Sequence, residues 1–245
     1  MVERANIERF RSANSELSAR VKAELEAYFG ALDLSKPEAA RNALLEFVPL
    51  LTEQYGAVAA TLAADWYDEL RLASGSTSAF RTVTAPAVPA AAVQSQVRFL
   101  AGHLWSPEPM AMLGGLLAST DKYVKQPGRD TVAFNAEREG VRWARVPTGG
   151  KTCSWCLIIA SRDAVFLSER SATKRADGGR YHGACDCQAV RIADDDDYPE
   201  GYLPSEYYEM YTTARDEAGS GNMGEIATSM RRLFPNFVND GVHSH

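Results

Sequence analysis

All four cysteines of the chain lie in one stretch, together with one of its four histidines. The stretch reads Cys153-Ser-Trp-Cys156 and then, after 25 residues, His182-Gly-Ala-Cys185-Asp-Cys187. Two thiol clusters separated by a loop of this length have the spacing of a tetrahedral metal site, in which each cluster supplies two ligands. This pattern constrains the region to fold so that the two clusters meet.

Zinc suits this set of side chains, because thiolate and imidazole groups are good ligands for a borderline-soft d10 ion. We expect the four cysteines to bind the metal and His182 to support the loop from outside, through a hydrogen bond to a thiolate or carbonyl. In the alternative, His182 is a ligand together with either Cys185 or Cys187. A four-cysteine site has no open position for a substrate, so the predicted zinc is structural.

Two disulfides, or a redox-active Cys153–Cys156 pair, are the alternatives to a metal. The first ten residues are charged and lack the apolar segment of a signal peptide. We therefore expect synthesis in a reducing cytoplasm, which favours metal binding over disulfide formation when the chain first folds.

The composition excludes some classes of function. The chain has 245 residues, of which 45% are apolar, so it can bury a sizeable core. Its formal net charge of −6 disfavours broad electrostatic binding to nucleic acids. No apolar run approaches the roughly 20 residues that span a bilayer, so no membrane segment is predicted.

The first half of the chain has the apolar periodicity of helices. A stripe from Ile7 to Tyr28 predicts a helix ending near Gly30, and Ser35 and Glu38 form a capping-box pattern before a long second helix that ends at Ser74-Gly75. Further helices are predicted over 89–104, 107–123 and 130–140, with a connector rich in Ser, Thr, Ala and Pro over 75–89.

From Val141 onward the sequence pattern changes from helix-like to a mixture of short strands and helices. Strands are predicted over 141–146, 164–167 and 188–192, a short helical turn over 156–161, and two helices near the C-terminus over 205–215 and 225–234. The acidic run Asp194–Asp197 is interpreted as a solvated loop. The predicted fold is α+β, with a helical region over 1–128, a small metal-clipped α+β domain over 129–200, and C-terminal helices with a frayed tail over 201–245.

Several motifs of the C-terminal half resemble a known family. Arg145-Val-Pro-Thr-Gly-Gly, Cys153-Ser-Trp-Cys156, Ala160-Ser-Arg-Asp-Ala-Val165 and His182-Gly-Ala-Cys185-Asp-Cys187 are similar to the Mu F-like minor head proteins of tailed bacteriophages, especially the actinobacterial-phage branch. The resemblance covers about residues 130–192. Members usually have Arg between the last two cysteines, where this chain has Asp186, a change that leaves the predicted ligands intact.

The resemblance implies a structural virion component of low copy number, synthesised in the host cytoplasm. Such proteins associate with the portal vertex or the capsid interior and take part in head morphogenesis, so the portal protein, the major capsid protein or both are the expected partners. No catalytic step is required, and we expect no enzymatic activity.

Capsid maturation protease is an alternative function. The chain has no Gly-x-Ser-x-Gly and no His-Glu-x-x-His, and only Cys153 or Cys187 with His182 could supply a thiol nucleophile and a base. His103 is expected on the apolar face of its helix. The strings Ser76-Thr-Ser78 and Glu137-Arg-Glu139 superficially match elements of ADP-ribosyl transferases and are interpreted as chance occurrences.

A zinc module that contacts DNA in the capsid lumen is the second alternative. Basic residues, among them Arg170, Lys174 and Arg175, lie between the two halves of the cysteine pattern. A local patch of this kind would allow weak, salt-sensitive contacts with the phosphates of packaged DNA.

Overall fold

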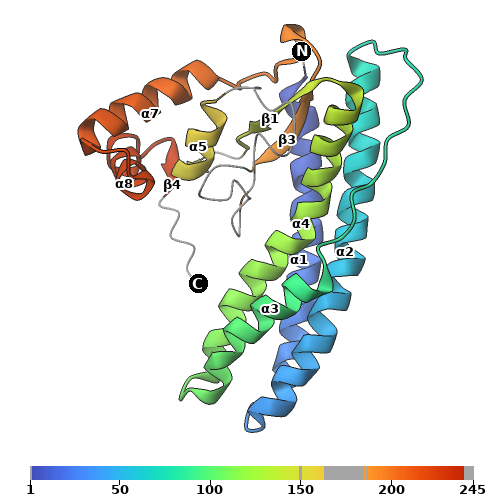
Figure 1. The fold of residues 1–245 in the computed structure, drawn as a ribbon, viewed down its shortest axis with the longest axis vertical. Coiled ribbons are helices and arrows are strands. Elements are labelled where there is room, and N and C mark those ends of the chain that lie inside the picture. The colour runs from blue at the N-terminus through green and yellow to red at the C-terminus, as the bar shows by residue number, and fades with distance from the viewer. Residues whose placement is uncertain (1, 149–150, 163–184, 186, 240–245) are drawn as a thin grey trace.

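Helices α1 (Arg4–Gly30), α2 (Pro37–Ala73) and α4 (Met112–Glu139) lie side by side along the long axis of the molecule (Figure 1). This computed structural model describes residues 2–148, 151–162, 185 and 187–239. Helix α3 (Ala90–Leu100) packs against α2 and α4, and the 3-10 turns η1 (Ala101–Trp105) and η2 (Pro109–Ala111) connect it to α4. The helical N-terminal half is confirmed.

The predicted apolar stripes form the core of this bundle. Leu25 of α1 and Leu44 of α2 are fully buried in one cluster with Val93 of α3 and Leu116 of α4. Gly128 of α4 allows close approach to α2, because a Cβ there would lie 2.9 Å from the carbonyl oxygen of Ala59. Isolated helices are only marginally stable in water, so burial of these stripes supplies most of the stability of the bundle.

Helix α4 differs from the prediction, which placed a break between residues 123 and 130. The helix is continuous through Pro127. The Pro127 ring packs toward Gly56 of α2, where a Cβ would lie only 3.2 Å from the proline Cγ. The Thr131 hydroxyl donates a hydrogen bond to the Pro127 carbonyl at 2.7 Å. Proline inside a helix costs about 3 kcal/mol, and packing against α2 offsets this cost.

The capping box predicted at Ser35 is also wrong. Helix α2 starts at Pro37, and its N-cap residue Lys36 makes no side-chain capping bond. The Ser35 hydroxyl instead donates to the Asp33 carboxylate at 2.6 Å. Proline lacks an N–H group, so the first turn has one donor fewer to satisfy.

A two-stranded antiparallel ribbon starts the C-terminal half. Strand β1 (Arg142–Val146) pairs with β3 (Gln188–Ile192), so that Val146 lies opposite Gln188. A short parallel pair joins β2 (Thr152–Cys153) to β4 (Val238–Asn239), and α5 (Ser154–Ala160) follows β2 directly. The fold class is therefore α+β, as predicted. The strand expected over 164–167 lies outside the described residues.

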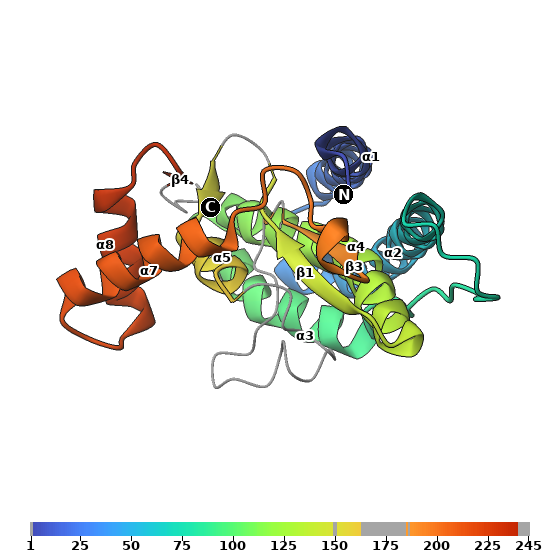
Figure 2. The ribbon, with the colours of Figure 1, turned by 90° about the horizontal axis from the view of Figure 1, so that it is seen from above.

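Helices α7 (Pro204–Ala218) and α8 (Met223–Leu233) lie to one side of the bundle, and the β1–β3 ribbon and α5 lie between them and α4 (Figure 2). Both C-terminal helices were predicted. The ribbon shares an apolar core with the upper bundle, which includes Val146 and Val190. In this core the rings of Phe10 and Trp66 are stacked, with centroids 4.1 Å apart. The predicted division between residues 128 and 129 falls within α4, and the three-part division stays a prediction.

None of the helices in the described ranges is long and apolar enough to cross a membrane.

Candidate metal centre

The first cysteine pair lies where β2 passes into α5. Cys153 ends β2 and is the N-cap of α5, and its Sγ accepts a hydrogen bond from the backbone N–H of Cys156 at 3.3 Å. Cys156 lies in the first turn of the helix. The strand-to-helix corner therefore turns both sulfurs toward one place, as the Cys-x-x-Cys spacing predicted.

The second pair reaches the same place through the β1–β3 ribbon. Because Val146 lies opposite Gln188, the chain leading to Cys153 and the chain carrying Cys185 and Cys187 leave the ribbon at the same end. The Sγ atoms of Cys156 and Cys185 are 3.3 Å apart, and those of Cys156, Cys185 and Cys187 all lie within 4.8 Å of one another. Pairing of two strands thus brings together thiols far apart in the sequence.

This arrangement fits a thiolate-bound metal. A tetrahedral zinc with Zn–S bonds of about 2.3 Å needs sulfurs about 3.8 Å apart. The Cys156–Cys185 pair is slightly closer than this, at 3.3 Å, and all three sulfurs lie within 4.8 Å of one another. All four cysteines form one buried cluster, in which Cys187 is fully buried and Cys153 is 9% exposed. None of the four forms a disulfide in the described structure. Three buried cysteines, Cys156, Cys185 and Cys187, are thus close enough to bind one metal ion.

The buried thiols have raised pKa values, so a bound cation would be needed to keep them ionised. Hydrogen bonds with Cys153, Cys185 and Cys187, together with burial, raise the pKa of the Cys156 thiol well above its usual range. The contact with Cys156 lowers the pKa of Cys187, but the hydrogen bond with Cys185 and burial outweigh it and raise that pKa as well. Metal binding at such a site replaces thiol protons, so binding weakens as the pH falls.

The fourth ligand stays a prediction. Cys153 belongs to the buried cluster but is not among the three mutually close sulfurs. His182, the alternative ligand, lies outside the described residues, as do Arg170, Lys174 and Arg175. The predicted contact with DNA therefore stays a prediction too.

Two side chains that the sequence analysis missed support the cysteines. Arg129 of α4 is buried and donates from Nη2 to the carbonyl oxygen of Cys185. The Thr152 hydroxyl lies 3.8 Å from the Sγ of Cys187. Arg129 is distant from both cysteine pairs in the sequence and lies in a helix predicted to be broken, so no local pattern indicated its role.

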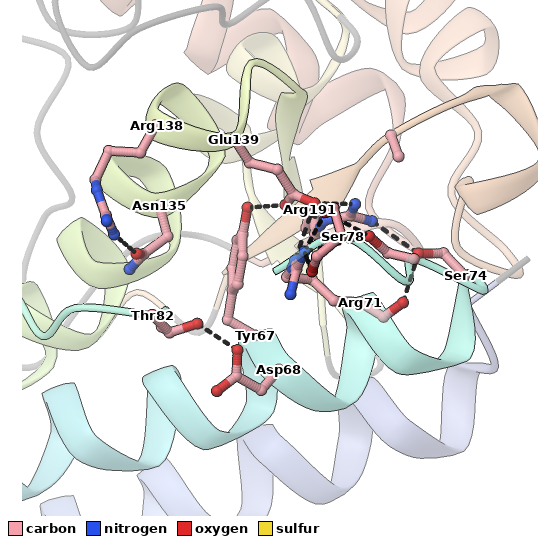
Figure 3. A network of polar contacts seen from close by, with 12 residues as sticks. Tyr67, Asp68, Arg71, Ser74, Ser78, Thr82, Asn135, Arg138, Glu139 and Arg191 are labelled. Atoms are coloured by element: carbon pink, nitrogen blue, oxygen red, sulfur yellow. Dashed lines mark hydrogen bonds and ion pairs between the residues drawn. The ribbon is translucent and has the colours of Figure 1, made fainter. Parts of the chain in front are cut away.

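A buried ion-pair network holds the ribbon to the bundle, toward the end of the ribbon opposite to the cysteines (Figure 3). Both oxygens of Glu139, at the end of α4, accept hydrogen bonds from Arg191 of β3 at 2.7 Å. Arg71 of α2 donates to the same carboxylate at 2.9 Å, and the Tyr67 hydroxyl donates at 2.6 Å. One carboxylate thus joins α2, α4 and β3.

The charges of this network favour the ionised carboxylate. Burial acts to raise the pKa of Glu139, but hydrogen bonds from Arg191, Tyr67 and Arg71 outweigh it and lower the pKa from 4.5 to about 2. Burial and the hydrogen bond to Glu139 raise the pKa of Tyr67. The Glu139 side chain is only 9% exposed, so its buried negative charge is stabilised by these donors and not by water.

Arg71 also contacts part of the motif interpreted as chance. Its Nη2 donates to the hydroxyls of Ser76 and Ser78 at 3.2 Å and 2.9 Å. Arg71 thus links Glu139 to these two serines. Arg71 and Glu139 lie near the ends of α2 and α4, and the serines lie in the connector after α2. The interpretation of the two strings as chance matches stays a prediction.

Two minor predictions are wrong, the first of them in part. The acidic run is solvated at Asp194 and Asp195, as predicted, but not at Asp197, which is 5% exposed. The 3-10 turn η3 (Asp195–Asp197) directs Asp197 toward the ribbon, where its Oδ2 accepts from Arg191 at 3.3 Å. His103 is exposed, because η1 replaces the regular helix and rotates this position away from the apolar face.

A profile of the VG15 protein family matches residues 1–214, so the match includes the helical half as well as the cysteine pattern. The chain belongs to the VG15 protein family. The Gene 15 protein of Mycobacterium phage D29 is 26% identical over 140 residues, which cover 45% of this chain and 51% of the relative. The Gene 15 protein of Mycobacterium phage L5 is 27% identical over 109 residues, which cover 31% of this chain and 37% of the relative.

The chain therefore spans about half, or less, of the length of these two relatives. No solved structure matches it. These similarities identify a family of bacteriophage proteins, as expected from the sequence.

Proposed function

We propose that this VG15 protein is a structural minor capsid protein of a tailed phage, associated with the portal vertex or the capsid interior. Its partners are the portal protein, the major capsid protein or both. The observation that carries the proposal is the family match over residues 1–214, whose curated relatives come from phages. The motifs similar to Mu F-like minor head proteins support the finer assignment to head morphogenesis.

The cysteine cluster serves in this proposal as a structural zinc site. Its sulfurs come from the corner between β2 and α5 and from the segment before β3, so a metal would cross-link these two parts of the chain. When bound, the metal supplies cross-linking and no open coordination position. We propose no enzymatic activity, since buried thiols in a closed site give a substrate little access.

Localisation is tested on particles purified by density gradient from cells that produce the phage. We expect mass spectrometry to detect the chain in the particles, at a copy number far below that of the major capsid protein. Detection in the cell lysate but not in the particles would overturn the proposal.

Partner choice is tested by co-expression with the portal protein or with the major capsid protein of the same phage. We expect the chain to co-purify with at least one of them, and the Cys153→Ser variant to co-purify less. Full binding by the Cys153→Ser variant would show that Cys153 is not needed for assembly.

A further inference from the structure

The end of the bundle farthest from the cysteines carries an exposed tryptophan between two hollows. Trp105, the last residue of η1, is 54% exposed at the end where α2 starts and α3 ends, the lower end in Figure 1. One hollow, of about 560 Å³, is lined by Arg41, Leu45, Arg98, Ala101, Gly102 and Trp105. The other, of about 520 Å³, is lined by Lys36, Pro37, Glu38, Ala39, Asn42 and Trp105. We call these two hollows the Trp105 groove.

The groove combines an aromatic surface with positive charge. The guanidinium carbon of Arg41 lies 5.6 Å from the centroid of the Trp105 ring, within the distance of a cation–π contact. Arg98 is exposed and makes no ion pair within the described part of the chain. Tryptophan and arginine are the residues that most often dominate the binding energy of protein interfaces.

The charges of the groove identify the kind of partner. Three cations, Lys36, Arg41 and Arg98, line it with one carboxylate, Glu38, although the whole chain has a net charge of −6. Lys36 is paired with Asp33 at 3.0 Å and Arg41 with Glu38 at 3.5 Å, so Arg98 is the cation that an acidic segment would meet first. The segment would compete with Asp33 and Glu38 for the other two cations, while an apolar side chain in it would contact Trp105 and Leu45. A nucleic acid strand fits less well, because the net negative charge of the chain and the exposed Glu38 repel a continuous line of phosphates.

We propose that the Trp105 groove is a docking site for an acidic peptide segment of a partner protein, one that carries an apolar or aromatic side chain among its carboxylates. Complementary charge selects the segment and guides its approach, and contact with the indole ring stabilises the complex. This binding is a property of the isolated chain, whether or not the chain is part of a virus particle.

The test measures binding of fluorescein-labelled peptides to the full chain by fluorescence anisotropy. The probe is a short peptide of glutamate, leucine and phenylalanine, compared with the same peptide carrying lysine for glutamate and with a single-stranded oligonucleotide. We expect the acidic peptide alone to bind, with an affinity that falls as salt rises.

Two groove variants and one control locate the binding. Arg98→Glu and Trp105→Ala should each weaken binding of the acidic peptide by about tenfold or more, the loss of roughly 1.4 kcal/mol. Arg215→Glu, an exposed residue in α7 with the same change of charge, should leave it unchanged. Equal binding by Arg98→Glu and the wild type, an equal loss in Arg215→Glu, or tighter binding of the oligonucleotide would each overturn the proposal.

Discussion

The bundle and the cysteine region of this VG15 protein are stabilised in different ways. In the lower bundle, apolar side chains repeat along α1, α2 and α4, and many residues share the stabilisation. Around the cysteines and along the ribbon, a few specific groups matter: four thiols, the Arg129 contact and the Glu139 network. An apolar core tolerates changes that conserve side-chain volume, whereas a site made of a few buried polar groups loses much when one is removed.

Removal of the metal should have the largest effect. We expect about one zinc per chain purified without chelator, and a chelator should open the cysteine region while the bundle keeps its helical signal. Structural zinc binding contributes on the order of 10 kcal/mol in small zinc domains. Zinc and thiol assays, circular dichroism and limited proteolysis measure this.

Wild-type protein reloaded with zinc is the control for that experiment, and it should regain its protection from protease. Protein with no metal and two disulfides per chain would contradict the structural zinc site. Loss of the helical signal upon chelation would contradict the distinction between the two regions.

Truncation of Glu139 should be the next most damaging change. Glu139→Ala leaves Arg71 and Arg191 buried without their common carboxylate, and we expect the free energy of unfolding to fall by about 3–5 kcal/mol. Glu137→Ala, an exposed position two residues earlier in α4, is the matched control and should have little effect. Urea denaturation of both variants checks this, and similar losses in the two would show that the network stabilises little.

Acid should weaken the junction between ribbon and bundle through the same carboxylate. The pKa of Glu139 is lowered from 4.5 to about 2 by folding, so its contribution is fully present above pH 4.5 and is lost as the pH falls toward 2. A shift of this size corresponds to about 3 kcal/mol. Urea denaturation at several pH values should show this loss in the wild type, and the loss should be smaller in Glu139→Gln. Parallel pH curves for the two proteins would exclude Glu139 as the cause.

Substitution of Arg129 should have the smallest effect of the four. Arg129→Ala removes the donor to the Cys185 carbonyl, and we expect zinc affinity to fall by about 10–100-fold, the range for residues that orient metal ligands. Competition with a zinc-binding dye measures this, and Arg129→Lys should restore part of the affinity. Unchanged affinity in Arg129→Ala would show that the contact does not orient the site.

Local patterns predicted most of the helices and the meeting of the cysteines, because periodicity and ligand spacing are written in neighbouring residues. The helix through Pro127 was missed, since the glycine of α2 that accommodates the ring is far away in sequence. Arg129 and Arg191 have partners that only the packing of β3 against α4 brings near. Asp197 was assigned to solvent for the same reason: its partner is recognised only once the ribbon exists.

The continuous helix α4 runs along most of the long axis of the bundle. Its 28 residues measure about 42 Å at 1.5 Å per residue. The helix starts beside the end that carries the Trp105 groove and passes the cysteines through Arg129 before it ends at Glu139. The helix thus fixes the distance between the Trp105 groove, near its start, and the cysteine cluster beside Arg129.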